Sequence, residues 1–167
     1  MRPDKIIEGK RILIVDDEKD VLDILNELLS MCKIDCASSF DEAKRLIEEN
    51  DYDVAILDIM GVNGFDLLKI AKTRNIPSLM LTAHALSEEN LKKSAEEGAF
   101  YYAPKDEMKK IDVFVADLIE AKEKKNNVWV RWFERLGGYF DKRFSGPNWR
   151  KKHKEFWDKK LKEFEGF

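Results

Sequence analysis

Apolar and polar positions alternate along residues 11–125 in blocks of two kinds. Runs of four or five residues rich in Val, Ile and Leu are typical of strands that a sheet buries on both faces. Between these runs, apolar residues recur every three or four positions, which predicts amphipathic helices. Strands are expected over 11–15, 34–37, 54–58, 76–81 and 99–102, and helices over 18–31, 40–49, 65–73, 87–96 and 107–124.

Local signals support several of these boundaries. Ser39 and Glu42 have the spacing of a capping box, so a helix is expected to begin near residue 40. Ser87 occupies the equivalent place in a later helix, and Gly98 is expected to end that helix. The residues before 11 are interpreted as a polar lead without an element of their own. Strands and helices in strict alternation predict an α/β domain built on a parallel sheet, with helices on both faces.

Polar side chains follow four of the five expected strands. Asp16 and Asp17 follow the first, Asp58 ends the third, Thr82 follows the fourth and Lys105 follows the fifth. In doubly wound sheets, ligands bind beyond the carboxyl ends of the strands. Taken singly, each residue has an ordinary explanation: Asp58 as a helix cap is as plausible as a nucleophile, and one of the first two acids is expected to cap a helix. Their agreement at one edge favours a functional site.

The chemistry of this set points to phosphoryl transfer. Clustered carboxylates need a cation, and hard oxygen ligands suit Mg²⁺. A lysine supplies a positive charge and a threonine hydroxyl can bond an anionic oxygen. Asp58 is the natural nucleophile, because carboxylates form aspartyl-phosphate.

The sequence resembles a response-regulator receiver domain of two-component signalling over residues 9 to 125. The resemblance rests on four motifs, which are Asp16-Asp17, Leu57-Asp58, Thr82-Ala83, and Gly98-Ala99-Phe100 leading to Pro104-Lys105. It implies a flavodoxin-like (βα)5 fold with strand order 2-1-3-4-5. It also implies a protein that catalyses only its own phosphotransfer and dephosphorylation, receiving the phosphoryl group from a histidine kinase or phosphotransfer protein.

The resemblance assigns roles to individual residues. Asp58 would be the phosphoacceptor, and Tyr102 would match the family's switch aromatic together with Thr82. Thr82 and Lys105 would contact the phosphoryl oxygens. The implied Mg²⁺ ligands are Asp16, Asp17, Asp58 and the backbone carbonyl of Met60.

The sequence departs from the family pattern in three places. The loop of residues 59–64 is interpreted as about two residues shorter than usual, which makes Met60 a modulating position. Asp106 follows Lys105 at a position where the family commonly has proline. The resemblance therefore does not determine the geometry of the peptide bond before Asp106. His84 lies two positions after Thr82, and in the family the residue at this position faces the attacking water. An exposed loop histidine is the more ordinary interpretation.

Residues 126–167 differ from the rest of the chain. They contain all four tryptophans of the protein, and carry 11 Lys and Arg against 6 Asp and Glu, a charge of +5 that leaves -8 for residues 1–125. The aromatic residues repeat at helical spacing on either side of a turn at 145–148, which predicts a helical hairpin with a kink or break at Gly137-Gly138.

This extension has several readings. The favoured one is a structural hairpin packed on the receiver or on a second copy. A docking surface for a downstream protein, or a basic aromatic face on an anionic membrane, are alternatives. The cluster from Arg150 to Lys154 is small for nucleic-acid binding, which is the weaker option.

Composition suits a soluble globular protein with a densely charged surface. At 167 residues, 44% hydrophobic and 38% charged, it has the size of one domain with an appendage. The absence of a long apolar run predicts a cytoplasmic protein, and Cys32 and Cys36 are expected to be buried free thiols. Two rival functions are an adaptor that works without phosphorylation, and a phosphatase of the haloacid-dehalogenase type. The phosphatase is disfavoured because that family carries its nucleophile after the first strand in an Asp-x-Asp arrangement, whereas Asp16 and Asp17 are adjacent.

Overall fold

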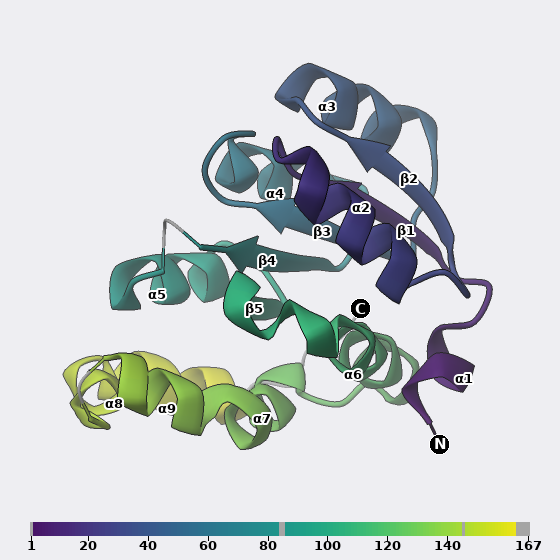
Figure 1. The fold of residues 1–167 in the computed structure, drawn as a ribbon. Coiled ribbons are helices and arrows are strands. Elements are labelled where there is room, and N and C mark those ends of the chain that lie inside the picture. The colour runs from purple at the N-terminus through teal and green to yellow at the C-terminus, as the bar shows by residue number, and fades with distance from the viewer. Residues whose placement is uncertain (1, 84–85, 145, 163–167) are drawn as a thin grey trace.

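A five-stranded parallel sheet forms the centre of the computed structural model, which describes residues 2–83, 86–144 and 146–162 (Figure 1). The strand order is β2-β1-β3-β4-β5, as predicted. The strands are β1 (Arg11–Val15), β2 (Lys33–Ala37), β3 (Val54–Asp58), β4 (Ser78–Thr82) and β5 (Tyr101–Pro104).

Helices cover both faces of this sheet. They are α2 (Lys19–Leu28), α3 (Phe40–Glu49), α4 (Gly64–Thr73), α5 (Glu88–Glu96) and α6 (Ile111–Lys124), the last preceded by a 3₁₀ helix, η1 (Lys105–Lys110). Right-handed crossovers with a reversal of direction at β1 place α2 on one face and α3, α4 and α5 on the other. Helix α6 packs beside α2, and α3 beside α4 (Figure 1).

Burial explains why the apolar runs form strands. Every residue of β3 and β4 is buried, as expected for central parallel strands, whereas β2 is partly exposed at the sheet's edge. The predicted caps are present: the Ser39 hydroxyl accepts a hydrogen bond from the Glu42 N–H at 3.3 Å, and Ser87 accepts one from the Asn90 N–H at 3.1 Å.

Several predicted boundaries were wrong by two or more residues. Strand β4 starts at Ser78 because the preceding Ile76 N–H bonds to the end of α4. Strand β5 starts at Tyr101 because Gly98, at φ +97°, turns the chain and Ala99 still bonds back to α5. Helix α2 ends at Leu28 rather than residue 31, and the expected 107–124 helix begins instead as η1.

The N-terminal lead was predicted to lack an element, but it forms α1 (Pro3–Ile7). Proline is favourable in a first helical turn. The apolar side chain of Ile7 is fully buried, and α1 packs on α6. The Cys32 thiol lies 3.3 Å from the Ile7 carbonyl. Cys32 and Cys36 are free, as predicted, but only half-buried.

The C-terminal extension forms three helices rather than a two-helix hairpin. They are α7 (Val128–Arg143), α8 (Asn148–Lys152) and α9 (Lys154–Lys162). Helix α7 runs through Gly137-Gly138 without the predicted break, since both glycines adopt helical geometry. The second arm is instead interrupted at His153. Phe164, expected on that arm, lies outside the described residues.

Helix α7 packs against the receiver-like body along β5 and α6, α9 packs on α7, and α8 packs on α9 (Figure 1). Trp129, Trp132 and Phe140 are fully buried, and Trp149 and Trp157 nearly so. The four tryptophans are therefore covered and cannot form a membrane face in this arrangement, while lysines of α8 and α9 remain exposed. Among the described helices, none has the length and apolar character that crossing a bilayer requires. A domain boundary at 125/126 stays a prediction.

Candidate functional site

The register of the strands brings the predicted strand-end groups to one edge. Thr82 lies opposite Pro104, the residue before Lys105. Asp58 lies opposite the residue before Thr82, and Asp16 follows β1 at the level of Asp58. Groups at the ends of four strands therefore lie at one edge of the sheet, although they are far apart in the chain.

Lys105 lies at the centre of this group. Its Nζ is 2.8 Å from Asp16 Oδ2, 3.1 Å from Glu18 Oε1 and 3.4 Å from Asp58 Oδ1. Asp16 is 1% exposed, Asp58 5% and Lys105 9%, so these charges interact with little screening by water. The predicted meeting of Lys105 with the acids is thus present.

Glu18 was missed by sequence reasoning. Asp16, Asp17 and Glu18 each offer one carboxylate oxygen, and these three oxygens lie within 4.8 Å of one another. Glu18 is the third acid of an uninterrupted run, which was the signal that could have found it. Asp16 Oδ1 also accepts a 2.9 Å hydrogen bond from the Glu18 N–H, which orders the turn before α2. The N-cap of α2 is Glu18 and it has no side-chain cap bond, so the expectation that Asp16 or Asp17 caps this helix was wrong.

Burial dominates the titration of Asp58. It raises the pKa of Asp58 to about 6, with the negative charge of Asp16 adding to the effect and the ammonium of Lys105 opposing it. Burial lowers the pKa of Lys105, but hydrogen bonding to Asp16 and the charge of Asp58 outweigh it and raise this pKa overall. Lys105 therefore remains a cation. Its single positive charge does not offset the burial of the Asp58 carboxylate and the negative charge of Asp16.

Two glycines let the loop after β3 lie close to the acids. A Cβ on Gly61 would lie 2.6 Å from the carboxyl carbon of Asp17, and Gly61 has φ +64°. A Cβ on Gly64 would lie 2.1 Å from the backbone oxygen of Asp58. Only glycine fits at position 64, where the neighbour is backbone, whereas a Cβ at position 61 would displace the Asp17 carboxylate. Helix α4 is capped by Asn63 in a left-handed conformation, so the alternative that Asp58 caps this helix was wrong.

Met60 lies in the same loop and is 55% exposed. Its carbonyl oxygen accepts a hydrogen bond from the Val62 N–H. A carbonyl has two lone pairs, so this bond leaves the oxygen able to accept a second partner. The ligand role of Met60 stays a prediction.

Thr82 and Tyr102 occupy neighbouring strands near the site. Thr82 ends β4 and is 1% exposed, and Tyr102 in β5 is fully buried. The Tyr102 hydroxyl accepts a 3.3 Å hydrogen bond from the Ser87 N–H. His84 lies outside the described residues. The peptide bond before Asp106 is trans, as are the others in the described part of the chain.

The donor set fits a divalent cation. Aspartate and glutamate oxygens are the hard ligands that Mg²⁺ prefers. The single positive charge of Lys105 faces the carboxylates of Asp16, Glu18 and Asp58, so the group has an excess of negative charge. A buried carboxylate beside an ammonium and a divalent cation can act as a nucleophile toward phosphorus.

A family model of the response regulator receiver domain matches residues 12–116. The chain is 37% identical over 90 residues to the two-component response regulator ARR18 of Arabidopsis thaliana, covering 50% of this chain and 14% of that protein. It is 37% identical over 80 residues to the regulatory protein VanRc of Enterococcus gallinarum, covering 45% of this chain and 35% of that protein.

Solved structures of receiver domains are also similar to this chain. The receiver domain of the Francisella response regulator 1452 superimposes with a TM-score of 0.61 at 28% identity. The match covers 67% of this chain and 98% of that domain. The chain therefore spans nearly all of a solved receiver domain, but a minor part of the two curated relatives.

Proposed function

The chain belongs to the response regulator receiver family, and from this premise we propose that Asp58 accepts a phosphoryl group from a phosphohistidine donor. The observation that carries the proposal is the position of the Asp58 carboxylate, buried at the end of β3 and 3.4 Å from Lys105 Nζ. A histidine kinase or a phosphotransfer protein is the proposed donor, in the cytoplasm.

The proposed transfer forms one bond and breaks another. An oxygen of the Asp58 carboxylate bonds to phosphorus, while the bond from phosphorus to the donor imidazole nitrogen breaks and its electron pair stays on that nitrogen. Lys105 would offset charge on the transferring group, and the Thr82 hydroxyl would donate to one of its oxygens.

Mg²⁺ is the proposed cofactor. Asp16, Asp17, Asp58 and the Met60 carbonyl would hold it, with Glu18 close enough to contribute. When bound, the cation supplies positive charge to the phosphoryl oxygens. Asp16 and Asp58 would hold it from the buried side, whereas Asp17, Glu18 and Met60 lie on the exposed side of the site.

A small phosphodonor tests the proposal directly. The protein is incubated with acetyl phosphate and Mg²⁺, and its intact mass is measured for the wild type, Asp58→Asn and Asp51→Asn. Asp51 lies before the same strand, with a side chain 99% exposed, and serves as the matched control. We expect the mass of one phosphoryl group on the wild type and on Asp51→Asn, and none on Asp58→Asn. Equal labelling of all three proteins would contradict the proposal.

A second candidate is an adaptor that acts through its C-terminal helices without phosphorylation. The observation that favours it is the fixed position of these helices on β5, where the buried Trp132 and Phe140 contact Tyr102. On this reading a downstream protein binds the exposed surface of α8 and α9, with a homodimer as a further option. Absence of any phosphoryl mass in the same experiment would favour the adaptor.

A further inference from the structure

An open cavity of 540 Å³ lies between α5 and the helices α8 and α9 of the C-terminal extension (Figure 1). Helix α5 lines one side of it, and α8 and α9 line the other. Its lining residues are distinct from those of the site at the strand ends. We call it the lysine cavity, because four of its seven lining residues are Lys92, Lys151, Lys152 and Lys154.

The charge of the lysine cavity is one-sided. Glu155 is the only acid among the described residues that line it. Ammonium groups brought together from separate helices repel one another, and a cavity lined by one sign of charge attracts ions of the other sign. The lysine cavity therefore favours an anion, and in particular one that carries more than one negative charge.

Three of the four lysines also contact acids at the rim of the cavity. In these pairs the lysine side chains are 31% to 73% exposed, so each pair contributes little to stability and can give up its ammonium group to a stronger anion. The pairs help to determine where the ammonium groups lie. They join Lys92 to Glu96 at 3.1 Å, Lys154 to Asp158 at 2.9 Å, and Lys152 to Glu88 and Glu89, both at 3.8 Å.

An aromatic ring positions the lysine that comes from α5. Lys92 Nζ lies 5.5 Å from the ring centroid of Phe156 in α9, which is within the range of a cation–π contact. Lys151 in α8 is exposed and forms no ion pair within the described part of the chain, so its ammonium group can turn toward an anion. Groups from three helices can therefore meet one ligand.

His153 lines the cavity between the end of α8 and the start of α9. Its Nε2 is buried and has no hydrogen-bond partner within the described residues. An unpaired polar atom of this kind costs free energy. Rotation of the imidazole toward the cavity would let a ring N–H donate to an anion, so binding would remove this cost.

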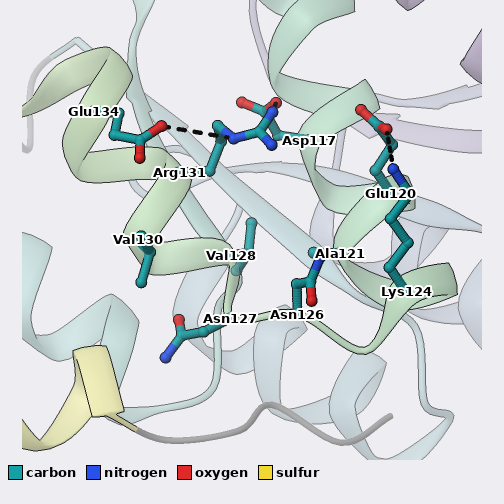
Figure 2. Close-up of a pocket in the computed structure, with 10 residues that line it drawn as sticks. All are labelled: Asp117, Glu120, Ala121, Lys124, Asn126, Asn127, Val128, Val130, Arg131 and Glu134. Carbon is teal, nitrogen blue, oxygen red and sulfur yellow. Dashed lines mark hydrogen bonds and ion pairs between the residues drawn. The ribbon is translucent and has the colours of Figure 1, made fainter. Parts of the chain in front are cut away.

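The pocket at the start of α7 differs, because its charges already pair with one another. It measures 340 Å³ and lies between the end of α6 and the start of α7 (Figure 2). Asp117 of α6 is 3% exposed and accepts hydrogen bonds from Tyr101, Arg131 and Arg135. Arg131 also reaches Glu134 (Figure 2). That pocket therefore offers no excess of positive charge to an anion.

We propose that the lysine cavity is a binding site for a phosphate-bearing polyanion, a compound with a phosphomonoester or pyrophosphate group. A phosphomonoester carries about two negative charges at neutral pH and offers three acceptor oxygens. Its tetrahedral oxygens can accept hydrogen bonds from ammonium groups on both sides of the cavity, which a planar carboxylate with one charge cannot match. The proposal does not depend on phosphorylation of Asp58, since the cavity shares no lining residue with that site.

Pyrophosphate is the probe for this site, and its binding to the full chain is measured by calorimetric titration in buffer freed of divalent cations. Lys92→Gln/Lys151→Gln removes one ammonium group from each side of the cavity. The matched control is Lys159→Gln/Lys162→Gln, which removes the same charge from exposed positions of α9 outside the cavity. We expect the cavity variant to bind pyrophosphate roughly tenfold more weakly than the wild type, and the control to stay within about twofold of it.

Vesicles distinguish two sources of the phosphate group. Co-sedimentation is measured with vesicles of phosphatidylcholine and phosphatidic acid, whose headgroup is a phosphomonoester, and with vesicles of phosphatidylcholine and phosphatidylglycerol at equal charge. Sedimentation with phosphatidic acid that Lys92→Gln/Lys151→Gln abolishes would identify a lipid headgroup as the source. Binding of pyrophosphate without sedimentation would identify a soluble phosphate compound.

The outcomes separate this inference from the proposed function. Asp58→Asn should bind pyrophosphate as the wild type does, and loss of binding in this variant would assign the anion to the strand-end site and overturn the inference. Absence of saturable pyrophosphate binding at millimolar concentration, or equal weakening in the two double variants, would also overturn it. Each of these results leaves the role of Asp58 as phosphoacceptor to the mass measurement.

Discussion

The ammonium of Lys105 lies 3.4 Å from the carboxylate of Asp58, yet the pKa of Asp58 stands at about 6. The reason is that burial and the charge of Asp16 together exceed the attraction of one ammonium that is shared among three acids. A site of this kind gains stability when an acid is protonated or a further cation arrives. This relationship makes the stability of the protein depend on pH.

Asp58→Asn is expected to stabilise the metal-free protein at pH 8. The folded pKa of about 6 exceeds the ordinary value of 3.8, so the folded state holds a proton that the unfolded chain has released. The resulting stabilisation is complete below pH 3.8 and is lost as the pH rises through 6. At pH 8 the variant avoids a cost on the order of 2 kcal/mol, which corresponds to a rise in Tm of roughly 5 °C.

Thermal unfolding in the presence of a chelator, at several pH values, checks this prediction. The advantage of Asp58→Asn over the wild type should shrink as the pH falls below 6. Asp51→Asn, at an exposed position, should follow the wild type throughout. An Asp58→Asn protein that is less stable than the wild type at pH 8 would contradict the assigned pKa.

Gly61→Ala is expected to weaken Mg²⁺ binding roughly tenfold, because the new Cβ would displace the carboxylate of Asp17. Gly9→Ala is the matched control. Gly9 has a similar φ of +75°, but a Cβ there meets nothing within 4 Å. Both variants should lose about 1 kcal/mol of stability from the left-handed backbone. Calorimetric titration with Mg²⁺ should separate them, and equal affinities would show that the close approach of Gly61 to Asp17 is unimportant.

Asp117→Asn is expected to lower the free energy of unfolding by about 3 kcal/mol. It leaves Arg131 and Arg135 without the buried carboxylate that they share with Tyr101. Glu120→Gln, on the same helix, removes only an exposed pair with Lys124 and should cost about 0.5 kcal/mol or less. Urea unfolding measures both, and hydrogen exchange of α7 amides should accelerate in the first variant only.

Gly138→Ala is expected to stabilise the protein by about 0.5 to 1 kcal/mol. Gly138 lies inside the continuous helix α7, and an added Cβ meets nothing within 4 Å. Alanine lowers the entropy of the unfolded chain and has the higher helix propensity. A loss of stability in chemical denaturation would instead support the kink that the sequence suggested at this position.

Periodicity predicted the α/β architecture because each apolar run is long enough to mark a buried strand, as Val54 to Leu57 illustrate. Boundaries were less accurate, since the ends of elements depend on bonds to distant segments. Tyr101 rather than Ala99 starts β5 because Ala99 bonds back to α5, which the local sequence does not encode. A kink or break was predicted at Gly137-Gly138 because glycine pairs often interrupt helices, whereas packing of Trp132 and Phe140 on β5 outweighs that preference.

The order of residues along the chain was enough to place Asp16, Asp58, Thr82 and Lys105 at one edge, because parallel strands present their carboxyl ends together. Tertiary structure alone revealed that Glu18 shares Lys105 with the other acids, and that Trp132 completes the hydrogen bonding of Tyr102. Both facts depend on the positions of side chains from separate elements. Spacing along one segment carries no information about such positions, since they follow from how helices pack on the sheet.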